Sequence, residues 1–336
     1  IDVASYYMSN YTCEYCRALL ERAIEGGYNF LDGICGVDAC AQMNRCMENI
    51  ELLKCVDKPN FFVTHADIPY KYTDYTLKHY VVQMQNRVLN TMHEKLGVDI
   101  SDAALREAVA RHNEVCKVMT EISELRKLAN PPITGYEFHI INMVSYVCPQ
   151  KLILPYLQET LAEIKKRKPD PKPWYRCRVG IVGSEVDDPN LTRMLEEAGA
   201  FICFDRFCFG MFPGREVIEL NDEEPALEQI CRHYLITSEC PRFMSNEKIE
   251  QRRETADRLA REFDADGIIY ENVKFCDFWG FERALASHIQ FEEYGHPVLT
   301  IDRPYNAKTS GQLRTRFQAF VESLEIKRIQ QGKEVK

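Results

Sequence analysis

The alternation of apolar and polar residues changes twice along the chain. Residues 1–72 mix two patterns: the spacing predicts a helix over 13–24, ended by a Gly-Gly pair, and short strands over 30–34 and 60–64. We therefore expect a first α/β domain over residues 1–72. The chain begins at Ile1 without a methionine and close to its first cysteine pair, so we expect an N-terminal part of this domain to be absent.

Residues 73–170 carry apolar residues at helical spacing almost throughout, which predicts a helical domain. Four helices are expected, at 75–96, 102–128, 136–147 and 149–166. Ser101 is a suitable N-cap for the second of them. The charged, proline-rich stretch 165–173 that follows is typical of a linker.

Residues 171–336 alternate between short apolar runs and amphipathic stretches. Strands are predicted at 178–182, 200–204, 267–271 and 298–302, and helices at 189–198, 226–236, 247–263, 281–293 and 311–329. Strands that alternate with helices indicate a parallel sheet covered on both faces, in which ligands bind beyond the carboxyl ends of the strands. We expect a second α/β domain over residues 171–336.

Composition and charge narrow the class of protein. The 336 residues are 45% hydrophobic and 28% charged, which is typical of a folded globular protein. The net charge of −9 argues against a broad nucleic-acid or anionic-membrane surface. The sequence carries no secretory signal and no apolar run long enough to span a membrane, so we expect a cytoplasmic protein.

Cysteine is the unusual component, with 14 residues. A chain of this length has core enough without disulfides, and reduced cytoplasmic cysteines find their main special use in metal binding. The sequence contains neither GxGxxG nor GxxxxGK[ST], which argues against dinucleotide binding and nucleotide hydrolysis by this chain. Its histidines lack metal-ligand spacing, and each is more typical of a structural or surface residue. Far-separated thiolates without histidine partners favour an iron–sulfur cluster or zinc.

The cysteines differ in their places relative to the predicted elements. Four lie in loops after predicted elements, where an α/β protein assembles its sites: Cys40, Cys208, Cys240 and Cys276. Four others are expected to be inert core or surface residues: Cys116, Cys177, Cys203 and Cys231. Cys13 and Cys16 form a lone CxxC pair, a weak zinc or redox signal because no second pair completes it.

Several stretches of the chain resemble the 2-hydroxyacyl-CoA dehydratase and benzoyl-CoA reductase family. They are CEYCRALLERAIEGGYNFLDGICGVDAC at 13–40, IVGSEVDDPNLTRMLEEAGAFICFDRFCFG at 181–210, DGIIYENVKFCDFWGFE at 266–282 and SGQLRTRFQAFVESL at 310–324. Their order and spacing extend the resemblance over essentially the whole chain.

The resemblance implies a fold and a cofactor. Subunits of the family have two Rossmann-like (flavodoxin-like) α/β domains with parallel sheets and a helical domain, and a 4Fe–4S cluster sits at the domain junction on three cysteines. By position these match Cys13, Cys40 and Cys276, with Cys13 preferred over Cys16 because of its distance to FLDG at 30–33. One departure is Ala41, where the family usually has aspartate after the second ligand.

The resemblance also implies an activity. A homologous second subunit, or a second copy of the same chain, completes the enzyme, and an ATP-dependent iron–sulfur activator supplies one low-potential electron. In the dehydratases that electron converts a (R)-2-hydroxyacyl-CoA thioester into a ketyl radical, which expels the hydroxyl and leaves an enoyl-CoA. Three thiolates leave one iron position free for the thioester oxygen. No residue of this chain is assigned as catalytic acid or base.

Other interpretations stay open. Cys208 and Cys240 match positions that are cysteine in relatives with an 8Fe–9S double-cubane cluster, where a sixth ligand would come from Cys16, Cys35 or Cys46. With a double-cubane cluster, the chain would be a low-potential reductase of small molecules. With a single cluster, it could instead be a reductase of an aromatic acyl-CoA. A zinc-stabilised or electron-storing partner protein is the non-enzymatic alternative. Two arginines in QLRTR, Arg314 and Arg316, are candidates for packing or for binding a charged ligand group.

Overall fold

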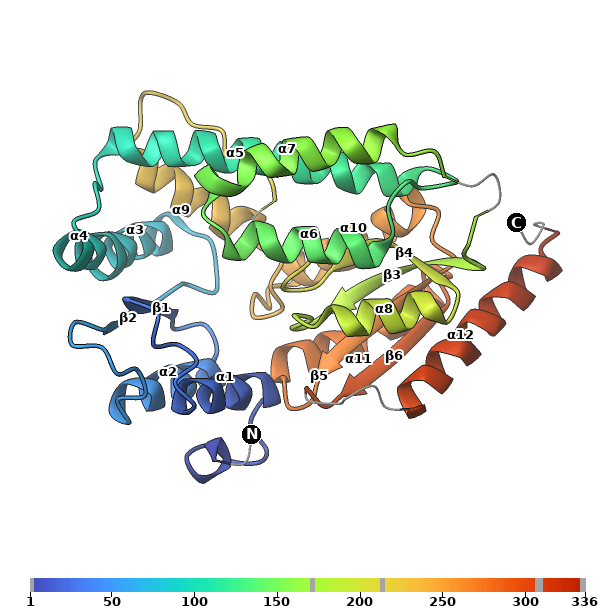
Figure 1. The fold of residues 1–336 in the computed structure, drawn as a ribbon, viewed down its shortest axis with the longest axis horizontal. Coiled ribbons are helices and arrows are strands. Elements are labelled where there is room, and N and C mark those ends of the chain that lie inside the picture. The colour runs from blue at the N-terminus through green and yellow to red at the C-terminus, as the bar shows by residue number, and fades with distance from the viewer. Residues whose placement is uncertain (1–2, 170–172, 212–214, 306–310, 333–336) are drawn as a thin grey trace. The chain divides into compact units, whose positions relative to one another are not determined.

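The computed structural model describes residues 3–169, 173–211, 215–305 and 311–332 (Figure 1). Its contacts divide the chain into two compact units, each assembled from segments that are distant in sequence. The first unit comprises Ile1–Ala110, Ile218–Ser245 and Val273–Phe278, and the second comprises Arg111–Val217, Asn246–Asn272 and Trp279–Lys336. The domain borders expected after residues 72 and 170 stay predictions.

A two-stranded parallel sheet lies in the first unit. β1 (Gly33–Val37) pairs with β2 (Phe62–Ala66), with Gly33 opposite Phe62 and Val37 opposite Ala66. The short helix η1 (Ala4–Tyr6) precedes α1 (Glu14–Ile24). Helix α1 packs against α2 (Ala41–Leu52), which also contacts both strands.

The rest of the first unit is helical. It contains α3 (Asp74–Gln83), the π-helical turn η2 (Met84–Leu89), α4 (Asn90–Leu96) and α9 (Ala226–Thr237). Helices α3 and α9 share an apolar core that includes Leu77, Leu227 and Phe243. The single helix predicted over 75–96 is thus interrupted by η2, where the Thr64 hydroxyl donates a hydrogen bond of 2.6 Å to the carbonyl of Arg87.

A four-stranded sheet organises the second unit. Its strand order is β4 (Ala200–Arg206), β3 (Cys177–Gly183), β5 (Gly267–Val273) and β6 (Val298–Arg303). Strand β3 pairs in parallel with both β4 and β5, so the direction of chain progression reverses between β3 and β5. Ligands of open α/β sheets bind at such a reversal, beyond the carboxyl ends of the strands.

Helices surround this sheet. The helix α5 (Asp102–Glu124) enters the second unit at Arg111 and ends in the short helix η3 (Leu125–Lys127). The others are α6 (Gly135–Val147), α7 (Gln150–Lys166), α8 (Pro189–Glu197), α10 (Asn246–Glu262), α11 (Asp277–Glu292) and α12 (Gly311–Gln330). Helices α8 and α12 share one apolar core with the sheet (Figure 1), and α5, α6 and α7 form a second core.

The α/β class with parallel sheets is confirmed, and the expected pair of Rossmann-like domains stays a prediction. In the first unit, the strand predicted with its approach over 30–34 begins only at Gly33, and one helix was not predicted. Phe30 lies in a turn and is 75% exposed, because consecutive turns continue from Gly26, at φ +77°, as far as Leu31 and delay β1 to residue 33. Helix α2 has no predicted counterpart, since only Cys46 and Ile50 of its residues are buried and its apolar stripe is therefore short.

Two further boundaries matter. Helix α11 begins at Asp277, four residues before the predicted start, so Cys276 stands directly before a helix. The predicted linker over 165–173 includes residues 170–172, which lie outside the described residues. Within the described ranges, no helix is both long and apolar enough to cross a membrane.

Candidate functional site

Three of the predicted cysteines stand at the starts of three helices, all within the first unit. Cys13 is the N-cap residue of α1, Cys40 is the N-cap residue of α2, and Cys276 directly precedes α11. The first backbone N–H groups of a helix have no partner inside the helix and favour a negative charge nearby. The helix N-termini therefore favour a thiolate at each of these positions, an effect that burial opposes.

The electrostatics differ between these sulfurs. The Cys16 thiol beside it and the N–H groups of Tyr15 and Cys16 lower the pKa of Cys13 to about 7, against the opposing effect of burial. The same contact, together with burial, raises the pKa of Cys16, which keeps the proton. Burial raises the pKa of Cys40, and the charges of Cys13 and Asp277 raise it further, while its helix N–H groups oppose the shift. Cys13 is the thiol most ready to become a ligand.

One side chain connects the three helix starts. The side-chain oxygen of Gln42 accepts a hydrogen bond from the backbone N–H of Cys13. Its NH₂ group donates to the carbonyl of Phe275 at 3.0 Å and to Oδ2 of Asp277 at 2.8 Å. Because Gln42 is the second residue of α2, it links the cap of α1 to the residues on either side of Cys276. Sequence reasoning missed Gln42, since a single polar residue near Cys40 does not by itself indicate a functional role.

The loop that carries Cys276 is held by backbone contacts. The N–H of Glu14 donates to the carbonyl of Lys274 at 3.3 Å, and the N–H of Cys276 donates to the carbonyl of Val273 at 3.0 Å. Phe275 has a left-handed backbone, with φ +67°, and its ring meets that of Tyr11 edge to face at 5.8 Å. A non-glycine residue in this conformation is uncommon and is kept there by surrounding contacts.

The segment before Cys13 is fastened to α1 by a buried arginine that sequence reasoning also missed. Arg17 donates to the carbonyl of Thr12 at 3.3 Å and to the side chains of Ser5 and Asn10 at 3.3 and 3.2 Å. These bonds fix the chain that enters the helix and so fix the position of Cys13.

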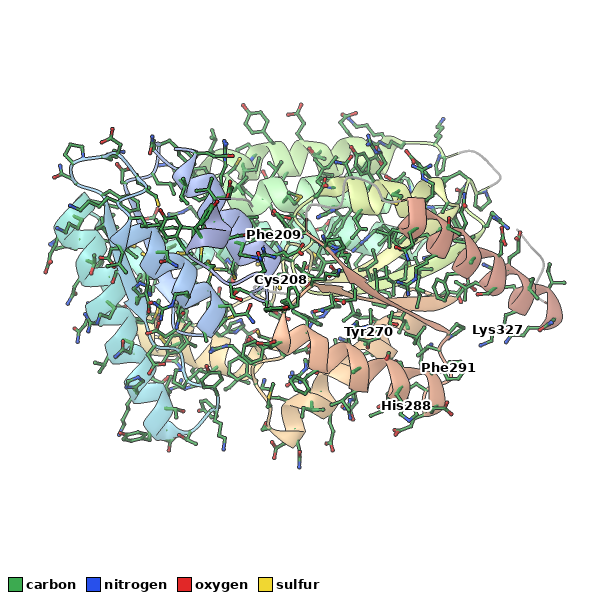
Figure 2. All side chains as sticks on the ribbon, turned by 90° about the horizontal axis from the view of Figure 1, so that it is seen from below. Cys208, Phe209, Tyr270, His288, Phe291 and Lys327 are labelled. Carbon is green, nitrogen blue, oxygen red and sulfur yellow. The ribbon has the colours of Figure 1, made fainter. Side chains whose placement is uncertain are left out.

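The two contingent ligands belong to different units. Cys240 follows α9 in the first unit, whereas Cys208 follows β4 in the second, where Figure 2 labels it beside Phe209. The N–H of Cys208 donates to the carbonyl of Ser184 at 3.1 Å, which places it near the reversal between β3 and β5. Of the possible sixth ligands, Cys16 and Cys46 are buried and Cys35 is exposed. A double-cubane ligand set stays a prediction.

The four cysteines expected to be inert are buried core residues. Burial raises the pKa of Cys116 to about 11, that of Cys203 to about 12 and that of Cys231 to about 12, and it raises that of Cys177 as well. A buried thiol with a raised pKa is a poor nucleophile and a poor ligand. Of the two environments expected for them, core or surface, all four occupy the core, and their inertness stays a prediction.

The three-cysteine site can be compared with the needs of an iron–sulfur cluster. Among the described residues, no three histidine, cysteine or carboxylate side chains converge closely enough to hold a single metal ion. A cubane places each thiolate on a different iron, so it requires a wider set than one ion does. Cys13, Cys40 and Cys276 supply three soft donors at helix starts that are joined through Gln42. In number and softness these residues fit such a cluster, and the lowered pKa of Cys13 agrees with it.

The strand ends of the second unit hold a buried polar network. Glu271, at the end of β5, is fully buried and accepts two hydrogen bonds of 3.0 Å from Ser184, one from its N–H and one from its hydroxyl. Its carboxylate also pairs with Arg303 at 2.6 Å, and burial raises the pKa of Glu271. The network fixes the turn after β3, to which Cys208 is bonded.

The two arginines of QLRTR contact protein groups. Arg314 pairs with Glu197 at 3.3 Å, and Arg316 donates to the carbonyl of Thr300 at 2.5 Å. Both contacts agree with packing roles on α12.

Comparison with known proteins decides the family. The family model described as "2-hydroxyglutaryl-CoA dehydratase, D-component" matches residues 1–324. The chain belongs to this family. The resemblance inferred from the cysteine-bearing segments is thereby confirmed over nearly the whole chain.

Three curated relatives of this dehydratase-family chain cover almost all of it. The (R)-phenyllactyl-CoA dehydratase beta subunit of Clostridium sporogenes is 26% identical, over 96% of this chain and 83% of the relative. The lactoyl-CoA dehydratase subunit beta of Anaerotignum propionicum is 24% identical, over 96% and 83%. A subunit of the benzoyl-CoA reductase of Thauera aromatica is 23% identical, over 96% and 81%. Each relative is named as one subunit of an enzyme.

Proposed function

We propose that the chain is the iron–sulfur subunit of a radical 2-hydroxyacyl-CoA dehydratase, which removes water from a (R)-2-hydroxyacyl-CoA to give an enoyl-CoA. The observation that carries the proposal is the family match over residues 1–324, in a chain whose Cys13, Cys40 and Cys276 stand at three helix starts of one unit. Two of the relatives are named for phenyllactyl-CoA and lactoyl-CoA.

Cys13, Cys40 and Cys276 would hold a 4Fe–4S cluster. When bound, the cluster would supply the low-potential electron that makes elimination of the hydroxyl group possible. The chain's own residues bind and tune it. The N–H groups at the starts of α1 and α2 stabilise charge on the ligand sulfurs of Cys13 and Cys40.

Partners follow from the same proposal. Each of the three relatives is named as one subunit of a larger enzyme, which supports a complex with a homologous second subunit or a second copy of this chain. We include an ATP-dependent iron–sulfur activator as the electron source and an acyl-CoA as the substrate. We expect no nucleic-acid or membrane partner, and we expect the cytoplasm as the location.

Metal analysis after anaerobic purification tests the cofactor. Roughly four iron and four sulfide per chain are expected. About eight irons per chain would replace the single cubane by the double-cubane alternative, with Cys208 and Cys240 as added ligands. One zinc per chain without iron would contradict the proposal and favour the non-enzymatic alternative.

Activity distinguishes the two enzyme classes. The purified complex with its activator, ATP and a reductant should convert (R)-phenyllactyl-CoA or (R)-lactoyl-CoA to the enoyl-CoA without net consumption of reductant, because the electron returns. The similarity to a benzoyl-CoA reductase supports a reductase as the second candidate. Stoichiometric use of reductant with benzoyl-CoA, and no dehydration, would replace the first proposal by the second.

A further inference from the structure

We propose that Gln42 is the positioning residue of the three-cysteine site, fixing the loop of Cys276 against the starts of α1 and α2. This inference rests on the proposed function, because it assumes that the three cysteines are ligands. The observation behind it is the set of three hydrogen bonds from one carboxamide to Cys13, Phe275 and Asp277.

The chemistry of the carboxamide explains why glutamine stands there. A glutamine side chain has one acceptor oxygen and two N–H donors, and the three bonds use the oxygen and the nitrogen together. The oxygen faces the N–H of Cys13, which can only donate, and the nitrogen faces the carbonyl of Phe275, which can only accept. This pairing fixes the orientation of the amide. Glutamate cannot donate to Phe275, and lysine cannot accept from Cys13.

The three bonds act on one ligand's backbone and on the two residues that flank another ligand. One holds the N–H of Cys13 itself, and two hold the residues immediately before and after Cys276. The third ligand, Cys40, lies two residues before Gln42 on the same helix start. A shift of any one helix start relative to the others therefore stretches a bond to the same amide. The outer contacts of ligands commonly set metal affinity by a factor of about 10–100.

We expect the first unit to fold without Gln42. Helices α1 and α2 already pack through buried residues that include Leu20, Cys46 and Ile50. The Gln42 side chain is only half-buried, so its loss leaves no large cavity. A change at Gln42 is thus expected to alter the cluster more than the free energy of unfolding.

Substitutions of Gln42 test the proposal by cluster retention. In Gln42→Leu and Gln42→Glu, we expect iron release to a chelator to be at least about 10-fold faster than in wild type, with a changed electron paramagnetic resonance spectrum of the reduced cluster. The matched control is Glu51→Gln on the exposed face of the same helix, which should keep the wild-type rate and spectrum. Circular dichroism should show unchanged helix content in every variant.

A polarity swap separates positioning from a general structural role. Gln42→Glu places a carboxylate beside Asp277, whereas Gln42→Glu combined with Asp277→Asn restores a donor–acceptor pair between the two side chains. The double variant should recover part of the lost retention and move the spectrum back toward wild type. Asp277→Asn alone keeps an acceptor for Gln42 and should retain iron almost as wild type does.

The outcomes distinguish the two proposals. Wild-type protein that holds four irons while both Gln42 variants keep its release rate and spectrum overturns the role of Gln42 and leaves the proposed function intact. Wild-type protein without iron overturns both. If Gln42→Leu fails to fold, the nearly isosteric Gln42→Glu and the double variant decide the question alone. A double variant no better than Gln42→Glu also overturns the proposal.

Discussion

The two units bury polarity in different forms. The second unit buries charge in pairs: Arg126–Asp205, Arg252–Glu282 and Arg303–Glu271 all have side chains at most 8% exposed. The first unit has buried thiols at a helix start, Cys13 and Cys16 of α1. The buried thiols of the second unit lie within its core, away from helix starts: Cys116, Cys177 and Cys203. A paired charge is satisfied by the protein itself. A thiol at a helix start still has bonding capacity for something from outside.

This difference assigns separate roles to the two units. A partner removed from a buried ion pair leaves an uncompensated charge, so substitutions in the second unit should lower the free energy of unfolding. A cysteine removed from a helix start leaves a helix that still folds, so substitutions in the first unit should lower cofactor content. Matched variants in the two units, compared by stability and by iron content, can test this difference.

The largest expected effect is the loss of the proposed cluster in Cys276→Ala. Iron per chain, measured after anaerobic purification, should fall to a small fraction of the wild-type value while the circular dichroism spectrum stays unchanged. Cys177→Ala is the matched variant, since Cys177 lies fully buried at the start of β3. It should keep its iron and lose about 1 kcal/mol of stability. Full iron retention in Cys276→Ala would remove Cys276 from the ligand set.

Arg126→Met should have the next largest effect. It leaves the Asp205 carboxylate buried without its 2.6 Å partner, and the side chains of Arg126 and Asp205 are only 1% and 2% exposed. We expect a loss of roughly 3–5 kcal/mol in urea unfolding.

Adding Asp205→Asn to Arg126→Met should recover part of this loss. Asparagine removes the uncompensated charge and can still accept from the N–H of Met211, as Asp205 does at 2.9 Å. A loss below about 1 kcal/mol in Arg126→Met would show that this unit does not depend on its buried pairs.

A smaller effect should appear as pH dependence through His139. Neutral His139 donates from Nε2 to the carbonyl of Val186 at 2.8 Å, and burial lowers the pKa of His139 from its ordinary value of 6.5. Below pH 6.5 the unfolded chain therefore binds more protons at this site than the folded chain, and stability falls as the pH drops.

The stability difference between wild type and His139→Gln isolates this contribution. Thermal unfolding at about pH 7.5 and about pH 5.5 should show that acidification destabilises wild type by about 1 kcal/mol more than the variant. Equal losses in the two proteins would contradict a buried neutral histidine.

The smallest effect is expected at Arg314. Its pair with Glu197 is about half exposed on both sides, so Arg314→Ala should change the free energy of unfolding by no more than about 0.5 kcal/mol. Unchanged activity of the complex would agree with a packing role. A strong rise in KM for the acyl-CoA would instead restore Arg314 as a ligand-binding candidate.

The sequence predicts an element correctly where the pattern that defines the element lies within its own residues. Long apolar stripes predict α5, α7 and α12 closely, and the Ser101 cap is present, accepting a bond of 3.3 Å from the N–H of Ala104. Helix α2 escapes sequence reasoning because two buried residues do not make a periodic stripe. Pairings between distant residues, such as Arg126 with Asp205, leave no local pattern because neither side chain changes the periodicity of its own element.

The cysteines of the candidate site can be predicted from the sequence, but the hydrogen bonds that join their helix starts cannot. Cys13, Cys40 and Cys276 follow from the family resemblance, and each stands at a helix start. That Cys276 directly precedes a helix depends on a boundary that the sequence places four residues too late. The contacts of Gln42 depend on the path of the chain and could only come from the structure.

The bond between Gln42 and Asp277 joins residues 235 positions apart. During synthesis from the N-terminus, α1 and α2 can form long before the loop of Cys276 leaves the ribosome. The three cysteines consequently cannot be gathered until most of the polypeptide has been made, and a nascent or truncated chain that ends before Val273 lacks the third one. For the cluster proposed above, this means that full loading has to wait until the chain is nearly complete.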